Sequence, residues 1–159
     1  MSVLRLIEEG KVGFNDSIAM HIDPLLKSGN GTTMLELWGG DQRINNVTIY
    51  EVMHMKGGLA DYDDDAMLKW TLANPDKDFT PWDYLYTIKN KFICDPGTCE
   101  YYSSPGYSLL AFVAAAHNGA TSWETFDQMT MFPDWLRNSF NETFFMGKGK
   151  CSTHSNLTH

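Results

Sequence analysis

Residues 101–119 read YYSSPGYSLLAFVAAAHNG and contain the longest apolar stretch of the chain, from Leu109 to Ala116. Pro105 leads into this stretch, and Gly119 closes it as glycine commonly closes a helix. The sequence therefore predicts a buried helix from about Tyr107 to Asn118. The stretch is far shorter than the roughly eighteen apolar residues that a membrane-spanning helix needs.

Shorter helical patterns lie on both sides of this stretch, whereas strictly alternating strand patterns are nearly absent. The segments predicted to be helical, wholly or in part, are residues 2–9, 47–55, 63–72, 81–92 and 123–131. Residues 10–50 look mixed and rich in glycine, with turn signals at 28–31 and 39–41. We therefore expect a mainly α fold with long loops.

Composition describes one soluble globular domain and excludes several kinds of partner. The 159 residues are 43% hydrophobic and 20% charged, which argues against disorder. The net charge of −8 repels phosphate backbones and anionic lipid surfaces. We therefore expect neither a nucleic-acid partner nor a membrane partner.

The spacing of two cysteines suggests a small disulfide loop. Cys94 and Cys99 bracket the sequence Asp-Pro-Gly-Thr, a turn signal that brings its two ends together. Two separate thiols in a reducing cytosol would give the same spacing, so the pattern alone leaves both readings open. Cys151 is left over and is available to a partner outside this sequence.

Asparagines followed by serine or threonine favour a secreted protein. Among ten asparagines chance predicts about 1.4 Asn-x-Ser/Thr acceptors for N-glycosylation, whereas the chain has five. The predicted glycosylation sites are Asn15, Asn30, Asn46, Asn141 and Asn156. Together with the cysteine loop, this excess predicts a secreted or extracellular protein.

The first residues do not read as a signal peptide. Val3, Leu4, Leu6 and Ile7 form one apolar face that is already helical, without an N-cap before it. We therefore expect the chain to begin within a helix and to be a fragment of a longer protein.

Several familiar chemical motifs are absent or incomplete in the sequence. Asp61, Asp63 and Asp65 alternate like half of a calcium loop, but the glycine and the glutamate that should follow are missing. His21, His54 and His117 stand alone in sequence, as partly buried or surface histidines usually do. Phosphate-binding glycine loops and G-x-S-x-G elbows do not occur. We predict no metal and no cofactor.

The stretch around Tyr102 resembles a motif of the serine β-lactamase-like family, which includes class C-type β-lactamases, esterases and D-Ala-D-Ala carboxypeptidases. Its residues 101–107 are similar to the pattern Tyr-Ser-(Asn)-x-Gly-Tyr, which an apolar helix follows. Residues 4–11, 47–62 and 122–126 resemble three other family segments in the family order. The likeness covers most of residues 2–145 and leaves 146–159 as a flexible tail of a single partial domain, 1–159.

This resemblance implies the helical region of a β-lactamase-like α/β fold, with most of the sheet missing, and a role for two site residues. In that family a Ser-x-x-Lys serine attacks an acyl carbonyl, and lysine and tyrosine handle its proton. Tyr102 matches the family tyrosine, and Ser104 stands where the family usually has asparagine. A tyrosine acts as a base at neutral pH only where cations lower its pKa from about 10. No serine of this chain has lysine three positions on, so we expect the chain alone to be inactive.

Three functional readings remain open at this point. The chain is a piece of a secreted serine hydrolase acting on an ester, amide or β-lactam, or a non-catalytic binding or assembly module, or an unrelated α-domain. The first two predict a partner, namely the remainder of its own fold or another protein. Trp82, Trp123 and Trp135 are candidates to face such a partner, or to fill the core.

Overall fold

The apolar stretch forms α7 (Ser104–His117), the central helix of the structure, which is a computed structural model of the chain. The structure describes residues 2–62, 64–77, 79–88 and 91–140. Helix α7 begins before the predicted Tyr107, because the side chain of Ser103 caps it by accepting the N–H of Gly106 at 3.2 Å. Pro105 fits this first turn, where the missing N–H costs nothing.

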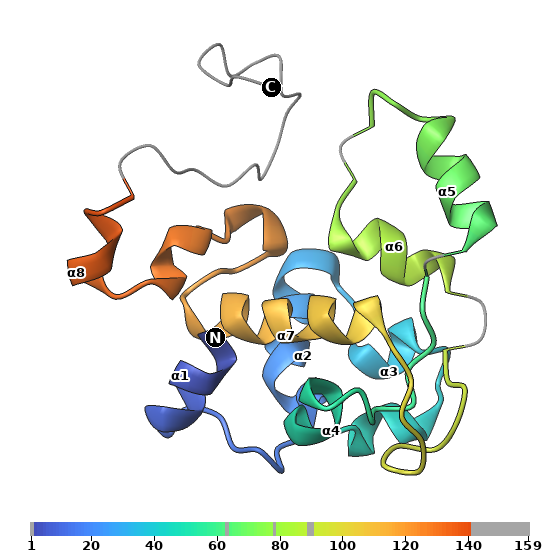
Figure 1. Cartoon of the computed structure of the whole chain (residues 1–159), viewed down its shortest axis with the longest axis horizontal. Helices are drawn as coiled ribbons and strands as arrows, with labels where there is room; N and C mark the ends of the chain where they lie inside the picture. The colour runs from blue at the N-terminus through green and yellow to red at the C-terminus, as the bar shows by residue number, and fades with distance from the viewer. Residues whose placement is uncertain (1, 63, 78, 89–90, 141–159) are drawn as a thin grey trace.

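Other helices surround α7 along its length, as Figure 1 shows. Those that pack against it are α1 (Ser2–Glu8), α2 (Ile18–Asn30), α4 (Ile49–Met53) and α6 (Pro81–Thr87). Two short helical segments, α3 (Met34–Leu37) and the 3₁₀ turn η1 (Gln42–Asn46), pack on α2 and on each other. Helix α5 (Asp65–Leu72) lies at the edge of the molecule and has no buried residue.

The largest difference from the sequence prediction is α2, a long helix within residues that looked mixed. Its residues Ile18, Ile22 and Leu26 are completely or almost completely buried and face the core at helical spacing. Gly31, with φ 66°, ends the helix in the left-handed conformation. The turn signal at 28–31 was therefore a helix C-terminus, and Pro24 lies inside the helix.

The predicted helix over residues 123–131 is wrong. Two 3₁₀ turns take its place, η2 (Trp123–Thr125) and η3 (Gln128–Met131), followed by the short helix α8 (Asp134–Arg137). The chain is extended at Phe126 and Asp127, and the Asp127 carboxylate then accepts the N–H of Met129 at 2.9 Å. A capping side chain in the middle of the segment thus starts a second turn instead of continuing the first.

The described part of the chain contains isolated β-bridges but no β-strand. One bridge joins Ser17 to Thr48 and so ties the start of α2 to the start of α4. The other joins Leu59 to Phe92. The mainly helical fold confirms the prediction of a mainly α fold. It corresponds to the helical region of an α/β fold, with most of the sheet missing, that the family resemblance implied.

The core lies between α7 and the helices around it. Phe112 is fully buried and stacks on Trp82, with ring centroids 3.8 Å apart. Trp123 meets the edge of Phe112 at 5.1 Å. Two of the three tryptophans in question therefore pack in or against the core, whereas Trp135 is 77% exposed.

A reciprocal capping box starts α4 and gives a first prediction. The Thr48 hydroxyl accepts the N–H of Glu51 at 3.2 Å, and the Glu51 carboxylate accepts the N–H of Thr48 at 2.8 Å. Thr48→Ala is expected to lower the free energy of unfolding by about 1 kcal/mol in urea denaturation. Glu51→Gln keeps an acceptor at the same place and should cost clearly less. An unchanged free energy of unfolding for Thr48→Ala would show that the box does not stabilise α4.

Candidate functional site

A disulfide loop precedes the tyrosine motif. The structure joins Cys94 to Cys99, with Cα atoms 6.4 Å apart, around the predicted turn. The N–H of Gly97 inside the loop donates to the carbonyl of Lys56 at 2.8 Å. An ion pair of 3.0 Å between Lys56 and Glu100 holds the same side of the loop and raises the pKa of Lys56. The loop is therefore fixed to the segment that follows α4.

Hydrogen bonds continue this attachment on both sides of the disulfide. Ahead of it, the N–H of Ile93 donates to Gly58 O at 2.9 Å. After it, the N–H of Tyr101 donates to Met55 O at 2.9 Å. Met55 adopts φ 58°, an uncommon value for a residue with a side chain, so the backbone turns sharply at this point. Residues 91–101 thus run along residues 55–60 and deliver the chain to the tyrosine motif.

The two serines of the motif attach it to the same neighbouring segment. Ser103 is buried, and its hydroxyl lies 3.5 Å from the carbonyl of Ala60. The N–H and the hydroxyl of Ser104 both donate to one carboxylate oxygen of Asp61, at 3.4 and 3.3 Å. Asp61 is therefore a negative group at the N-terminal end of α7, where the helix dipole favours it.

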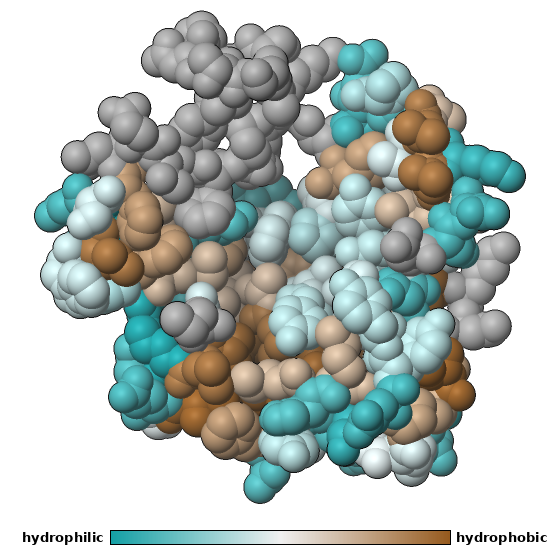
Figure 2. All heavy atoms as spheres, in the orientation of Figure 1, coloured by the Kyte–Doolittle hydropathy of each residue, from teal (hydrophilic) through white to brown (hydrophobic). Residues whose placement is uncertain are grey.

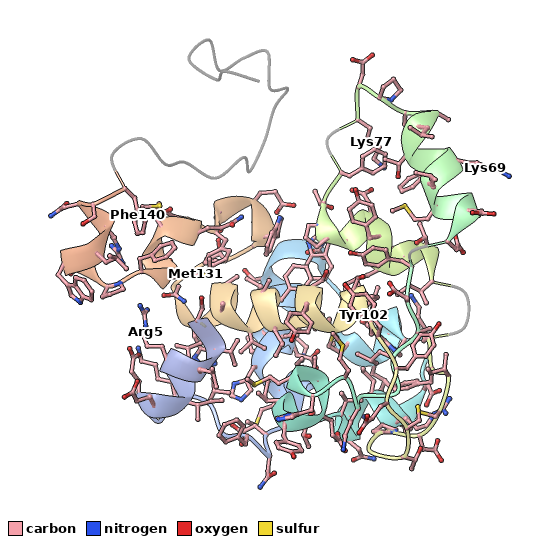
Figure 3. All side chains as sticks on the ribbon, in the orientation of Figure 1. Arg5, Lys69, Lys77, Tyr102, Met131 and Phe140 are labelled. Atoms are coloured by element: carbon pink, nitrogen blue, oxygen red, sulfur yellow. A yellow bond between two sulfur atoms is a disulfide. The ribbon has the colours of Figure 1, made fainter. Side chains whose placement is uncertain are left out.

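Tyr102 lies at the surface. Its side chain is 67% exposed, and Figure 3 shows it in front of α7. Among the described residues no hydrogen bond or ring contact holds the phenol in place. An aromatic side chain that packed its loop onto the next helix would be buried, so this alternative to a site role is not what the structure shows. The hydroxyl is accessible to a substrate or to another part of a protein.

Two apolar hollows of about 360 and 390 Å³ lie away from Tyr102, the first between α1 and α7 and the second between α1 and residues 131–136. They share Ser2, Leu4 and Met131 in their walls. Figure 2 shows hydrophobic residues gathered at the surface of this region. Arg5 ties the two sides together, because its guanidinium donates to Met131 O at 2.6 Å. Tyr102 and Ser104 line neither hollow.

The structure describes some of the predicted glycosylation sites, whereas others lie outside the residues that it describes. Asn15, Asn30 and Asn46 are exposed at the surface, where a glycan would fit. Asn141, Asn156, Cys151 and the predicted tail at 146–159 lie outside the described residues. Within the described residues, no three His, Cys, Asp or Glu side chains are grouped to hold a metal ion. The described helices include none that is long and apolar enough to cross a membrane.

Asp61 was not predicted to be part of this site, because its partner Ser104 is 43 positions away in the sequence. From the sequence alone, Asp61 was only one of three aspartates in an incomplete calcium-loop pattern. The signal that could have found it is local: Asp61 is the second-to-last residue of the segment at 47–62 that resembles a family stretch. Two segments that resemble one family in order are candidates to meet in space.

Comparison with known proteins establishes the family. A family model described as Beta-lactamase matches residues 1–141, which is most of the chain. The chain therefore belongs to the beta-lactamase family. Searches of curated proteins and of solved structures found no match.

Proposed function

We propose that the chain is the tyrosine-bearing helical part of a secreted serine hydrolase that acts on an ester, an amide or a β-lactam. Membership of the beta-lactamase family supports the reaction class. The observation that carries the proposal is the exposed Tyr102 directly before the capped start of α7, with the disulfide loop and Asp61 fixing the backbone on either side.

In the proposed reaction the nucleophile comes from outside this sequence, because no serine here begins a Ser-x-x-Lys motif. That serine attacks the acyl carbon, and its single proton passes to a base, which is either the lysine or Tyr102. When the tetrahedral intermediate collapses, this base returns the proton to the leaving group, and an acyl-serine forms. Water then attacks the acyl-serine, which releases the acid and restores the serine. Ser104 stands at the family's asparagine position; because its hydroxyl hydrogen is donated to Asp61, its oxygen would accept a hydrogen from the lysine.

The chain alone should therefore not carry out acyl transfer. After incubation with a fluorophosphonate probe, its intact mass is expected to be unchanged, because no activated serine is present. Hydrolysis of p-nitrophenyl acetate and of a chromogenic cephalosporin should not exceed the buffer rate. Covalent labelling of any serine, abolished by prior heat denaturation, would overturn the proposal.

The protein isolated from its natural source should show the activity that the chain alone lacks. We expect a deglycosylated mass well above 18.0 kDa and a Ser-x-x-Lys segment preceding the residues of α1. In that protein, Tyr102→Phe should lower kcat/KM by about 10²- to 10⁴-fold, the usual contribution of a general acid or base. Tyr101→Phe is the matched control, since that side chain is half exposed and, within the described residues, Tyr101 is bonded through its backbone N–H. Equal activities of the two variants would remove Tyr102 from the mechanism.

The same mass measurement tests the proposed compartment. Passage through the secretory pathway would oxidise Cys94 and Cys99 and offer the exposed Asn15, Asn30 and Asn46 to glycosylation. Treatment with a glycosidase should then reduce the mass of the natural protein. An unchanged mass together with two free thiols at Cys94 and Cys99 would place the protein in a reducing compartment instead.

The alternative proposal is a non-catalytic binding or assembly module. It is favoured by the exposure of Trp135 and by the two apolar hollows beside α1, which a protein partner or the remainder of the fold would cover. This reading requires a natural protein of about 18.0 kDa that begins at Met1. A longer protein that forms an acyl-serine would exclude it.

A further inference from the structure

Three side chains from distant parts of the sequence form a continuous hydrogen-bonded chain between α2 and α7. His117, the last residue of α7, places Nε2 2.9 Å from Nδ1 of His21 in the first turn of α2. Nε2 of His21 lies 2.9 Å from Oδ2 of Asp16, in the loop before α2. The side chain of His21 is only 7% exposed, so water cannot readily replace these bonds.

The directions of these bonds follow from the available hydrogens. The Asp16 carboxylate can only accept, so Nε2 of His21 carries a hydrogen and donates it. A neutral imidazole has one N–H, so Nδ1 of His21 is left as an acceptor. Nε2 of His117 must therefore carry a hydrogen and donate it to His21. In the neutral state every bond of the chain is satisfied.

One added proton leaves the chain intact, but a second one breaks it. The first can bind Nδ1 of His117, which is not used in the chain, while Nε2–H still donates to His21. A second proton would have to bind Nδ1 of His21. Two N–H groups would then face each other across 2.9 Å, and two positive rings would lie with centroids 5.0 Å apart.

We propose that Asp16, His21 and His117 form an acid-sensitive latch that holds α2 against α7 while it binds at most one proton and opens when the second binds. The latch joins the two longest helices of the structure, which pack directly on each other. It does not depend on the proposed hydrolase activity, because none of its residues lies in the tyrosine motif.

The charges around the latch act in the same direction. Asp16 stays ionised, because the N–H of Gly13 and then His21 lower the pKa of its carboxyl. Burial lowers the pKa of His117, and a proton on His21 or the charge of Lys11, which follows α1, lowers it further. Lys11 is itself paired with Glu9 at 2.8 Å. These groups favour the neutral state of His117 in the folded chain.

The sign of the pH effect follows from these shifts. An unfolded chain protonates both histidines near the ordinary pKa of about 6.5. The folded chain takes up fewer protons, because the pKa of His117 is lowered and the geometry of the latch excludes the second proton. Stability from the latch is therefore present above about pH 6.5 and is lost as the pH falls below it. For each proton that the folded chain excludes, the folding equilibrium constant falls tenfold for every unit that the pH drops below this range.

The test is urea denaturation of the full chain at pH values from 7.5 to 5, above the range where most carboxylates titrate. The informative variant is His117→Gln, because a glutamine amide can turn to offer either N–H or oxygen to His21 and so serves both of its protonation states. For each unit that the pH falls below about 6.5, the folding equilibrium constant of the wild type should fall by a factor about ten larger than that of His117→Gln. His54→Gln is the control: His54 is exposed, and its hydrogen bond and ring contact within the described residues are both with Tyr50, so the variant should follow the wild type.

A spectroscopic readout keeps the inference testable if His117→Gln does not fold. Imidazole ¹⁵N shifts of the wild-type chain at pH 7.5 should show hydrogen on Nε2 of both His21 and His117. At pH 5.5 the folded chain should contain no molecule with both rings protonated. Two protonated rings in the folded state, or equal pH slopes for wild type and His117→Gln, would overturn the latch.

Discussion

Phe112→Ala is expected to lower the free energy of unfolding by about 3–5 kcal/mol, which is a large part of the stability of a domain of this size. Phe112 is fully buried at the centre of α7, stacked on Trp82 and met at its edge by Trp123. Its removal leaves a cavity against two large rings that cannot both move in to fill it. Urea denaturation followed by tryptophan fluorescence measures the loss, because both rings next to the cavity are emitters.

Tyr107→Ala on the same helix is the control for Phe112→Ala. Tyr107 is 54% exposed, and a surface substitution of this kind usually changes stability by about 0.5 kcal/mol or less. Both variants place alanine in α7, so helix propensity contributes little to the comparison. A loss of less than about 1 kcal/mol for Phe112→Ala would show that α7 is not the centre of the core.

Gly58→Ala is expected to be the second severe change, because a side chain at this position meets backbone. A Cβ at Gly58 would lie 2.4 Å from the carbonyl oxygen of Cys94 and 3.2 Å from its Sγ. The Cys94 backbone cannot readily move away, since the disulfide to Cys99 and the Ile93–Gly58 hydrogen bond hold it. Gly58 also has φ +67°, a conformation that costs a residue with a side chain about 1–2 kcal/mol.

Gly10→Ala separates these two costs. Gly10 has φ +69°, but a Cβ there would meet nothing within 4 Å. In Gly10→Ala the free energy of unfolding should therefore fall only by the cost of the backbone conformation. In Gly58→Ala it should fall by a further ~1–3 kcal/mol from overpacking. Hydrogen exchange at the N–H of Tyr101 should also speed up in Gly58→Ala alone, since the displaced loop leads to that bond. Equal losses in both variants would mean that the disulfide loop does not press on Gly58.

Local signals explain which parts of the fold could be predicted from the sequence. The long apolar run, Pro105 and Gly119 lie next to one another, so α7 was predictable to within a turn. Helix α2 was hidden because Pro24, normally disfavoured inside a helix, and the glycines at its end conceal the spacing of its apolar residues. In the segment at 123–131, a capping bond of Asp127 outweighed an apparently continuous helical pattern.

The residues of the candidate site likewise fall into those that local signals predict and those that they do not. Tyr102, Ser104 and the Cys94–Cys99 loop could be named from the sequence, because each is part of a short motif. The partnership of Asp61 with Ser104 spans 43 positions, and that of His21 with His117 spans 96. Such pairs depend on how the helices pack, and a single sequence contains no direct signal of that packing. The exposure of Tyr102 likewise emerges only from the three-dimensional structure.

The position of α7 in the sequence has a consequence for biosynthesis. The helices that α7 covers, α1, α2 and α4, are all translated before it. While the ribosome adds residues 54–103, the faces of these helices that pack on α7 lack that partner and are exposed to other chains. Burial of the core must wait for contacts between residues far apart in sequence, which form slowly. The yield of folded protein should therefore depend on chaperones that hold the nascent N-terminal half until residue 117 has been made.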